Sequence, residues 1–193
     1  MPSPLFQLGH GFDTQGARRE DTAAGPWQHR RVRHDTSPGV GTARSPLTPL
    51  CATALTLVGR GEGRTAVVIG CAQGIEAIAL LRLGWTVVGI DEDPGAHERI
   101  RAATDVTSFD RLTPVLGSLG QMTRLPAADM VLARSALLGD DGRAKWHLVV
   151  QALRPGGYLA ARLSVGSAGL LRGWELLSER YTGTTLEVVA RRP

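Results

Sequence analysis

The sequence predicts an α/β domain in which helices cover both faces of a doubly wound, mostly parallel sheet. Two apolar, β-branched runs, at residues 66–69 and 85–90, have the composition of buried parallel strands, and an apolar segment of helical length separates them. A glycine-containing turn follows the first run, and a carboxylate, Asp91, follows the second. Strand, glycine turn, helix, strand and acid in this order are typical of a nucleotide-binding crossover unit.

The residues before this unit fall into two parts. Residues 1–46 are poor in bulky apolar side chains and rich in Gly, Pro, Ser, Thr and Arg, which predicts a mobile arm, or a segment that folds over a bound ligand as a lid. Residues 47–59 predict an apolar helix with Thr48 as its N-cap and Pro49 at its first helical position. We therefore expect an arm over residues 1–46 and a single α/β domain over residues 47–193.

The turn after the first strand runs from Gly70 to Gly74 and contains small residues that let the backbone pass close to a ligand. A helix is expected over residues 73–83, and its first amides would stay free for that ligand. A dinucleotide-binding turn would require a third glycine at Ile75, so the spacing favours a different nucleotide. Asp91 ends the second strand at the edge where open parallel sheets bind ligands, and a carboxylate there can accept hydrogen bonds from both hydroxyls of a ribose.

The elements after the acidic strand end are less regular. A helix is expected over residues 96–103, with Asp93 as its cap and Pro94 in its first turn. Residues 111–117 predict a weak third strand, and Pro114 favours an irregular or partly exposed position for it.

The second half of the chain completes the sheet. The expected elements are a strand at 127–133, a helix at 140–153, a turn at 154–157, a strand at 158–163, a short helical or turn segment at 169–174, and a hairpin formed by 174–181 and 184–191.

From residue 47 to 193 this order of elements resembles the class I S-adenosylmethionine (SAM)-dependent methyltransferases. The turn Gly70-Cys-Ala-Gln-Gly74 resembles the family's G-x-G-x-G motif with Ala72 in place of the middle glycine, and LRPGGYL, residues 153–159, resembles the turn before the family's fifth strand. LRPGGYL and LRGWELL, residues 171–177, also resemble the small tellurite-resistance type of this family.

The resemblance implies a Rossmann-like, seven-stranded sheet that a C-terminal antiparallel hairpin closes, with SAM as cofactor and no metal. Asp91 and Glu92 match the family's acidic pair, of which Asp91 would bind the ribose, and Ser118 takes the place of an acid that accepts a hydrogen bond from the adenine amino group. The residues expected to contact the cofactor are Gly70, Cys71, Ala72, Gly74, Asp91, Glu92, Ser118, Leu119 and Arg134.

Three departures from the family pattern bear on function. Val68 stands where the family often has an acid that anchors the methionine ammonium, Ala72 adds a methyl group where the backbone faces the cofactor, and Ser118 is neutral. Two lost charged hydrogen bonds, at about 1.5–3 kcal/mol each, would weaken SAM binding about 10²-fold or more unless other groups compensate.

The activity that the resemblance implies is transfer of a methyl group from the sulfonium of SAM to a small molecule by in-line displacement, for which the protein mainly orients the acceptor and excludes water. The sequence assigns no catalytic residue; candidate bases are His147 and, from the arm, His10, His29 and His34. The alternative is a methyltransferase-like protein with lost or altered chemistry that acts as a SAM-binding or partner subunit. Nucleic-acid or protein methylation is the third hypothesis.

Composition narrows the expected partners and location. The net charge of +4 comes almost wholly from arginines that are scattered rather than gathered with aromatic residues, which argues against a nucleic-acid partner. Two cysteines are too few for a disulfide framework, and no apolar run approaches the roughly 18 residues of a membrane span, so we expect a cytoplasmic protein. Because residues 164–173 are short where many of these enzymes bind the acceptor, the arm, the loop at 134–141 or a second subunit, as in a homodimer or with a partner protein, would complete that site.

Overall fold

The computed structural model describes residues 47–135, 137, 139 and 143–193. Contacts divide the chain into residues 1–42 and 43–193, and the described residues belong to the second unit. The predicted arm over residues 1–46 lies outside the described part of the chain.

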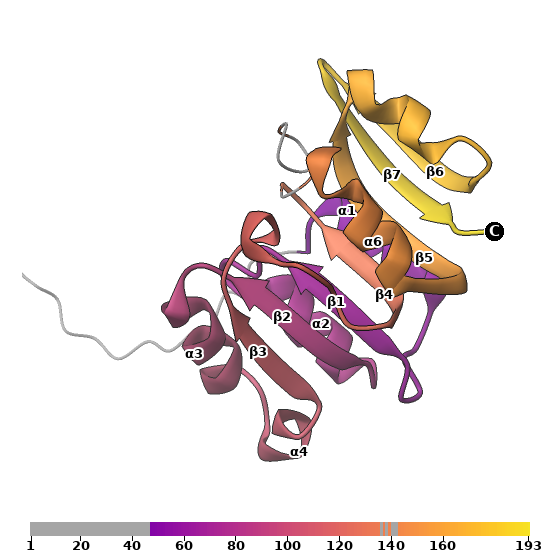
Figure 1. Cartoon of the computed structure of the whole chain (residues 1–193). Coiled ribbons are helices and arrows are strands. Elements are labelled where there is room, and N and C mark those ends of the chain that lie inside the picture. The colour runs from indigo at the N-terminus through magenta and orange to yellow at the C-terminus, as the bar shows by residue number, and fades with distance from the viewer. Residues whose placement is uncertain (1–46, 136, 138, 140–142) are drawn as a thin grey trace, which may run out of the picture. The chain divides into compact units, whose positions relative to one another are not determined.

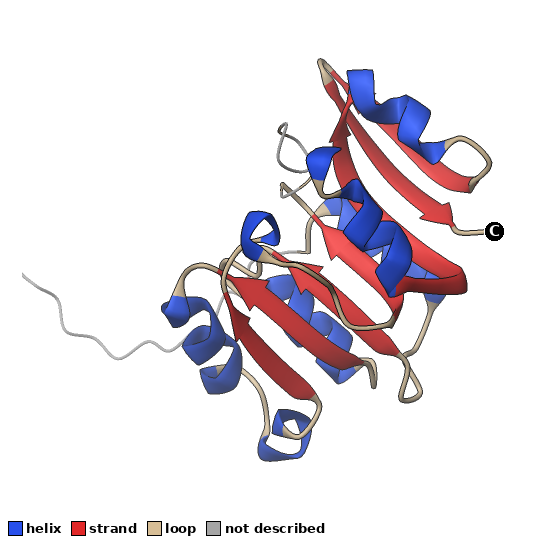
Figure 2. Cartoon of the chain, in the orientation of Figure 1, coloured by secondary structure: helices blue, strands red, loops and turns tan. Residues whose placement is uncertain are grey.

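A seven-stranded sheet in the order β3-β2-β1-β4-β5-β7-β6 forms the centre of this unit (Figures 1 and 2). The first five strands are parallel, β7 is antiparallel to β5, and β6 and β7 form the closing hairpin. The predicted doubly wound sheet with its C-terminal antiparallel hairpin is therefore confirmed. The strands are β1 (Thr65–Ile69), β2 (Thr86–Asp91), β3 (Leu112–Leu116), β4 (Ala128–Ala133), β5 (Leu153–Ser164), β6 (Glu175–Thr182) and β7 (Thr185–Arg191).

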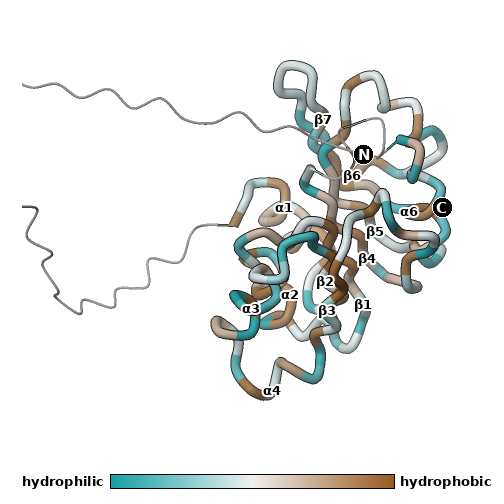
Figure 3. Tube along the Cα trace, turned by 60° about the vertical axis from the view of Figure 1, so that its left-hand side comes forward, coloured by the Kyte–Doolittle hydropathy of each residue, from teal (hydrophilic) through white to brown (hydrophobic). Residues whose placement is uncertain are grey.

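Helices lie on both faces of the sheet, because the central strands β1, β2 and β4 are apolar and buried on both sides (Figures 1 and 3). One face carries α1 (Pro49–Val58), α2 (Ile75–Arg82) and α3 (Pro94–Ala102); the other carries α6 (Trp146–Ala152) and the 3₁₀ segments η1 (Leu119–Gln121) and η2 (Val165–Leu171). A short helix, α4 (Val106–Phe109), precedes β3. Among the described residues, no helix combines the length and apolar character needed to cross a membrane.

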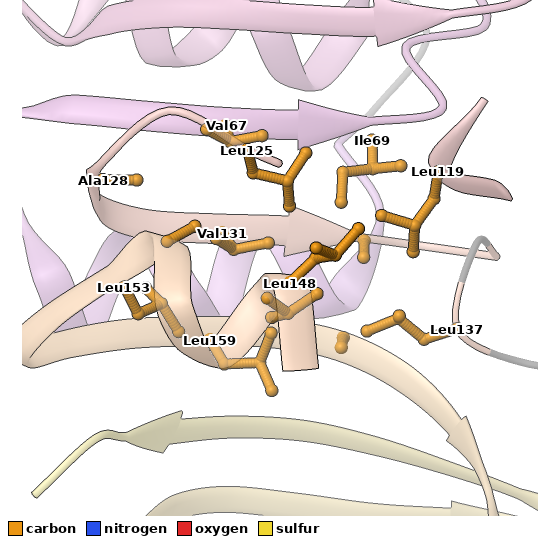
Figure 4. Packing of buried hydrophobic residues seen from close by; sticks show 14 of the residues in the cluster. Val67, Ile69, Leu119, Leu125, Ala128, Val131, Leu137, Leu148, Leu153 and Leu159 are labelled. Atoms are coloured by element: carbon orange, nitrogen blue, oxygen red, sulfur yellow. The ribbon is translucent and has the colours of Figure 1, made fainter. Parts of the chain in front are cut away.

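Alternate residues of each strand divide the core into two layers. Val67 and Ile69 of β1 point into the layer under α6, which Figure 4 shows with Val131 of β4 and Leu148 of α6, whereas Val68 joins the layer under α1, α2 and α3. Each layer contains buried or partly buried tryptophan. Trp85 is fully buried in the layer under α1–α3, and Trp146 and Trp174 pack together with ring centroids 5.7 Å apart against the other layer.

Helix caps account for two of the predicted boundaries. The Thr48 hydroxyl accepts a hydrogen bond from the Cys51 N–H at 3.4 Å with Pro49 at the first helical position, and Asp93 caps α3 through the Gly95 N–H at 2.8 Å. Both caps agree with the prediction from the sequence.

Several boundaries differ from the prediction. α3 begins at Pro94 rather than residue 96, and α6 begins at Trp146, whereas the predicted helix began at residue 140, outside the described residues. The second helix begins at Ile75 rather than residue 73, because Gly74 has a left-handed conformation with φ of +77° and still belongs to the turn. The last helix ends at Ala152, and the predicted turn at residues 154–157 is a looped-out part of β5, since the pairing passes from Leu153 opposite Ala128 to Tyr158 opposite Met130. The segment expected at 169–174 begins earlier, as η2.

The third strand is an edge strand, as its proline suggested. In β3 the side chain of Leu116 is 64% exposed, and Pro114 pairs in register with Gly89 of β2 only, with no strand on its other side. Of the two predicted possibilities, an irregular or a partly exposed strand, partial exposure is confirmed, whereas the pairing of β3 with β2 is regular.

Candidate functional site

The carboxyl ends of β3, β2, β1 and β4 lie next to one another along one edge of the sheet. Ile69 is in register with Ile90 of β2 and with Ala133 of β4, and Asp91 is in register with Leu116 of β3. The residues that follow these strands therefore succeed one another across about three strand spacings, or roughly 14 Å. The order of the strands reverses between β1 and β4, and such a switch point is where doubly wound sheets bind elongated ligands.

The turn after β1 has three left-handed residues, Gly70 with φ of +80°, Ala72 with +48° and Gly74 with +77°. Glycine adopts these angles without strain, and Gly74 also lacks room for a side chain, since a Cβ there would lie 2.5 Å from Cγ1 of Ile100. At Gly70 an added Cβ would make only an ordinary contact, with Oγ of Ser135 at 3.9 Å, so the described residues do not crowd the turn there. Ala72 alone adopts the left-handed conformation here with a side chain, at a cost of about 1–2 kcal/mol.

A ring of hydrogen bonds holds Ala72 in that conformation. Its N–H donates to Oδ2 of Asp91 at 2.8 Å, and its carbonyl accepts from Nε and Nη2 of Arg99 at 3.2 and 2.8 Å. Arg99 also pairs with Asp93 at 2.6 Å, and the Asp93 N–H donates to Oδ1 of Asp91 at 2.8 Å, which closes the ring. The Arg99 guanidinium, followed by the Gly95 N–H, lowers the pKa of the Asp93 carboxyl. Sequence analysis did not identify Arg99, because nothing local marks an arginine that bonds 27 residues back along the chain.

Asp91 keeps capacity for a ligand. Each of its carboxylate oxygens accepts one backbone hydrogen bond, and a carboxylate oxygen can accept two. Its side chain is half-buried at the end of β2, whereas Glu92 is exposed and forms no hydrogen bond or ion pair with the described residues. Of the predicted acidic pair, Asp91 is therefore the one built into the turn.

The side chains of two predicted contact residues point into the core. The Cys71 side chain is 1% exposed, with Sγ 3.7 Å from the carbonyl oxygen of Val68 and 3.8 Å from that of Ile90. Burial, reinforced by the charges of Asp91 and Glu76, raises the pKa of the Cys71 thiol to about 12. Leu119 is 4% exposed and packs in the layer under α6 (Figure 4). Cys71 and Leu119 could thus offer a ligand only their backbone.

Ser118 follows the edge strand and begins η1. Its N–H donates to Oε1 of Gln121 at 2.9 Å, and its side chain is half-buried. The residue lies where the prediction put it, after the end of β3 and on the far side of Asp91 from the glycine turn.

Arg134, also a predicted contact, forms an ion pair that sequence analysis did not foresee. Its Nη1 donates to Oε1 of Glu76 at 3.0 Å, and the Thr48 hydroxyl donates to the same oxygen at 3.2 Å. The Glu76 side chain is 4% exposed and that of Arg134 is 32% exposed. The only signal in the sequence was a single acid in the otherwise apolar stretch of α2.

Of the candidate bases, His147 alone lies among the described residues. His147 is exposed on α6, and its Nδ1 lies 3.1 Å from the carbonyl oxygen of Ala144; His10, His29 and His34 lie outside the described residues. His97, which the sequence did not suggest as a base, is 7% exposed. Its Nε2 lies 2.9 Å from the Gly89 carbonyl oxygen, so it supports the packing of α3 on β2. In the described part of the chain no three His, Cys, Asp or Glu side chains are placed to hold a metal ion.

An Ala72→Gly substitution should stabilise the domain. Glycine adopts the left-handed conformation without strain, which favours the folded state, but it also makes the unfolded chain more flexible. The net rise in the free energy of unfolding should be about 0.5–1 kcal/mol. Urea unfolding measures the change. The control is Ala79→Gly inside α2, where the same substitution should lower stability by about 1 kcal/mol. A loss of stability in both variants would contradict strain at Ala72.

Comparisons with known proteins were made on sequence and on structure. No family model matches the chain. The ribosomal protein L11 methyltransferase of Dechloromonas aromatica is 36% identical over 132 residues, which are 65% of this chain and 40% of the relative. That of Sodalis glossinidius is 32% identical over 167 residues, 83% of this chain and 53% of the relative. The chain spans about half or less of the length of these curated relatives.

Solved structures share the fold at low sequence identity. TehB from Haemophilus influenzae superposes with a TM-score of 0.64 at 12% identity, over 76% of this chain and 63% of that one. The N-methyltransferase NodS from Bradyrhizobium japonicum, in complex with S-adenosyl-L-homocysteine, has a TM-score of 0.58 at 18% identity, over 75% of this chain and 84% of that one. The chain therefore has the fold of the class I SAM-dependent methyltransferases, and the finer resemblance to the tellurite-resistance type stays a prediction.

Proposed function

We propose that this domain binds SAM across the carboxyl ends of β3, β2, β1 and β4 and transfers its methyl group to an acceptor. The observation that carries the proposal is the left-handed turn from Gly70 to Gly74, which the carboxylate of Asp91 holds directly through the Ala72 N–H. Its place at the switch point of a methyltransferase fold supports SAM rather than another nucleotide.

The residues along this edge fit the parts of the cofactor in strand order. Ser118 and the backbone of Leu119 would lie at the adenine, Asp91 at the ribose hydroxyls, and the glycine turn and Arg134 at the amino-acid end. The absence of a close contact at Gly70 among the described residues suits a ligand that lies against the turn. Bound SAM supplies an activated methyl group, so the chain itself needs to orient the acceptor and exclude water, and a base is needed only if the acceptor carries a proton.

Calorimetric titration of the full chain with SAM and with S-adenosylhomocysteine tests the cofactor. We expect both to bind with micromolar dissociation constants, and we expect ATP, which shares the adenosine but carries phosphates, to bind far more weakly. If neither SAM nor S-adenosylhomocysteine bound at millimolar concentration, the proposal would be contradicted and the hypothesis of a methyltransferase-like partner protein would be favoured.

Two classes of molecule are candidates for the methyl acceptor. A small molecule is the first candidate, because the sequence shows neither a local basic surface nor a proline-bearing acceptor motif near the fourth strand. A protein is the second candidate, because relatives that match the chain over part of their length are named ribosomal protein L11 methyltransferases.

Methyl transfer from labelled SAM distinguishes these acceptors when purified ribosomal protein L11 and the small-molecule fraction of a cell extract are offered separately. Label in the small-molecule fraction alone would support the first candidate, and label in L11 the second. Cofactor binding without transfer to either would favour a SAM-binding subunit that acts with a partner protein or as a homodimer. The organisation into an arm over residues 1–46 and a domain over 47–193, and the cytoplasmic location, stay predictions.

A further inference from the structure

We propose that the buried ion pair of Glu76 and Arg134 recognises the α-amino-acid end of the cofactor, with Arg134 binding the carboxylate and Glu76 the ammonium. This inference rests on the proposed function and assigns a role to Glu76 that the sequence did not suggest. An α-amino acid carries one charge of each sign on adjacent groups, and the pair presents the two complementary charges 3.0 Å apart.

The position of the pair follows from the sheet. Arg134 comes directly after β4, whose last residue is in register with Ile69 of β1, and Glu76 is the second residue of α2, which begins where the glycine turn ends. Asp91 ends β2, on the other side of β1. A ligand whose ribose lies at Asp91 and whose adenine lies toward β3 therefore extends its remaining end past the turn toward Glu76 and Arg134.

Both side chains retain hydrogen-bonding capacity in the described structure. The guanidinium of Arg134 has five N–H donors, of which one bonds a described acceptor, and the side chain is 32% exposed. Both described bonds to Glu76 end on Oε1. Its Oε2 accepts no hydrogen bond from the described residues.

The pair also replaces a charge that the first strand lacks. Val68 is 1% exposed in the layer under α1–α3, so β1 offers only an apolar side chain to this side of the turn. Glu76 supplies a carboxylate to the same layer from the helix instead. The negative charge of Glu76 acts on both buried cysteines. Burial is the main cause that raises the pKa of Cys51 and of Cys71, each to about 12, and the charge of Glu76 adds to it.

The test compares S-adenosylhomocysteine with 5′-methylthioadenosine, which keeps the adenosine and the sulfur but lacks the amino acid. The folded variant Glu76→Leu/Arg134→Leu removes both charges together. We expect it to bind S-adenosylhomocysteine about 100-fold more weakly than the wild type, as the loss of two charged contacts predicts, and methylthioadenosine within about threefold of the wild type. Decarboxylated S-adenosylhomocysteine should bind the wild type more weakly than S-adenosylhomocysteine does. Because it has no carboxylate for Arg134 to bind, its affinity for the Arg134→Gln variant should equal its affinity for the wild type.

The matched control removes the same two charges from the exposed surface of α3, as Glu98→Gln/Arg101→Gln, and should leave both affinities unchanged. An unaltered ratio of the two affinities in the Glu76→Leu/Arg134→Leu variant, with its circular dichroism native, would overturn the inference and leave the proposed function standing. If the wild type bound neither compound, the proposed function itself would fail, and the inference with it.

Discussion

The Asp91→Ala variant should bind S-adenosylhomocysteine about 10²-fold more weakly than the wild type, or not measurably, while the domain stays folded. Two hydrogen bonds from ribose hydroxyls to a carboxylate, at about 1.5–3 kcal/mol each, account for a loss of this size. The substitution also removes the acceptor of the Ala72 N–H, so the left-handed turn would lose one of the hydrogen bonds that hold its conformation. Calorimetry gives the affinity, and circular dichroism tests the fold.

Asp91→Asn separates the two effects. An amide keeps one acceptor oxygen, which can hold either the turn or a hydroxyl but carries no charge, so its affinity should fall between those of the wild type and Asp91→Ala. Glu98→Gln, on the exposed face of α3, is the control for a general change in surface charge. Wild-type affinity in Asp91→Ala would remove Asp91 from the cofactor site.

The Arg134→Leu variant should lower the free energy of unfolding by about 3 kcal/mol, because it leaves the carboxylate of Glu76, 4% exposed, without its cation. The value lies at the low end for a broken buried ion pair because the guanidinium is itself partly exposed. The double variant Glu76→Leu/Arg134→Leu should recover most of this loss, since two apolar side chains replace the pair and no buried charge remains.

Urea unfolding of the wild type, both single variants and the double variant forms a cycle that isolates the interaction between the two residues. Thr48→Val completes the set; it removes both the second donor to Oε1 of Glu76 and the N-cap of α1, and at about 1 kcal/mol for each it should cost about 2 kcal/mol. Additive losses in the two single variants would show that Glu76 and Arg134 do not interact in solution, and would also weaken the assignment of the pair to the ligand.

The elements of this fold could be predicted because the local signals are strong. The apolar run of β1, Gly84 after α2 and the caps Thr48 and Asp93 each fix an element or its end with nearby residues alone. The order of these elements, which resembles one family as a whole, predicted the closing hairpin, and Pro114 predicted the partial exposure of β3.

The boundaries that failed depend on distant partners. The LRPGGYL segment has the composition of a turn, yet Leu153 pairs with Ala128 of β4, so β5 begins before the glycines and its chain loops out within the strand. Gly74 suits either the first turn of a helix or the end of a loop, and only its approach to Ile100 of α3 places it in the turn.

The candidate site was foreseen as a set of positions, not as a set of contacts. The residues after four strands meet because parallel pairing aligns the strand ends, which sequence order can suggest. The bonds from Arg99 to Ala72 and from Arg134 to Glu76 join residues 27 and 58 positions apart, and no local pattern encodes them. Cys71 has the small size expected of the turn, but its side chain points inward, which only the geometry reveals.

The division of the core into two layers also provides two optical probes. Trp85 reports on the layer under α1–α3, and the contacting pair Trp146 and Trp174 reports on the layer under α6, while the fourth tryptophan, Trp27, lies outside the described residues. Fluorescence from chains that retain one set or the other would therefore follow each side of the sheet separately through denaturation. Coincident transitions would identify the sheet and both helical layers as a single cooperative unit, and separated ones would show which side opens first.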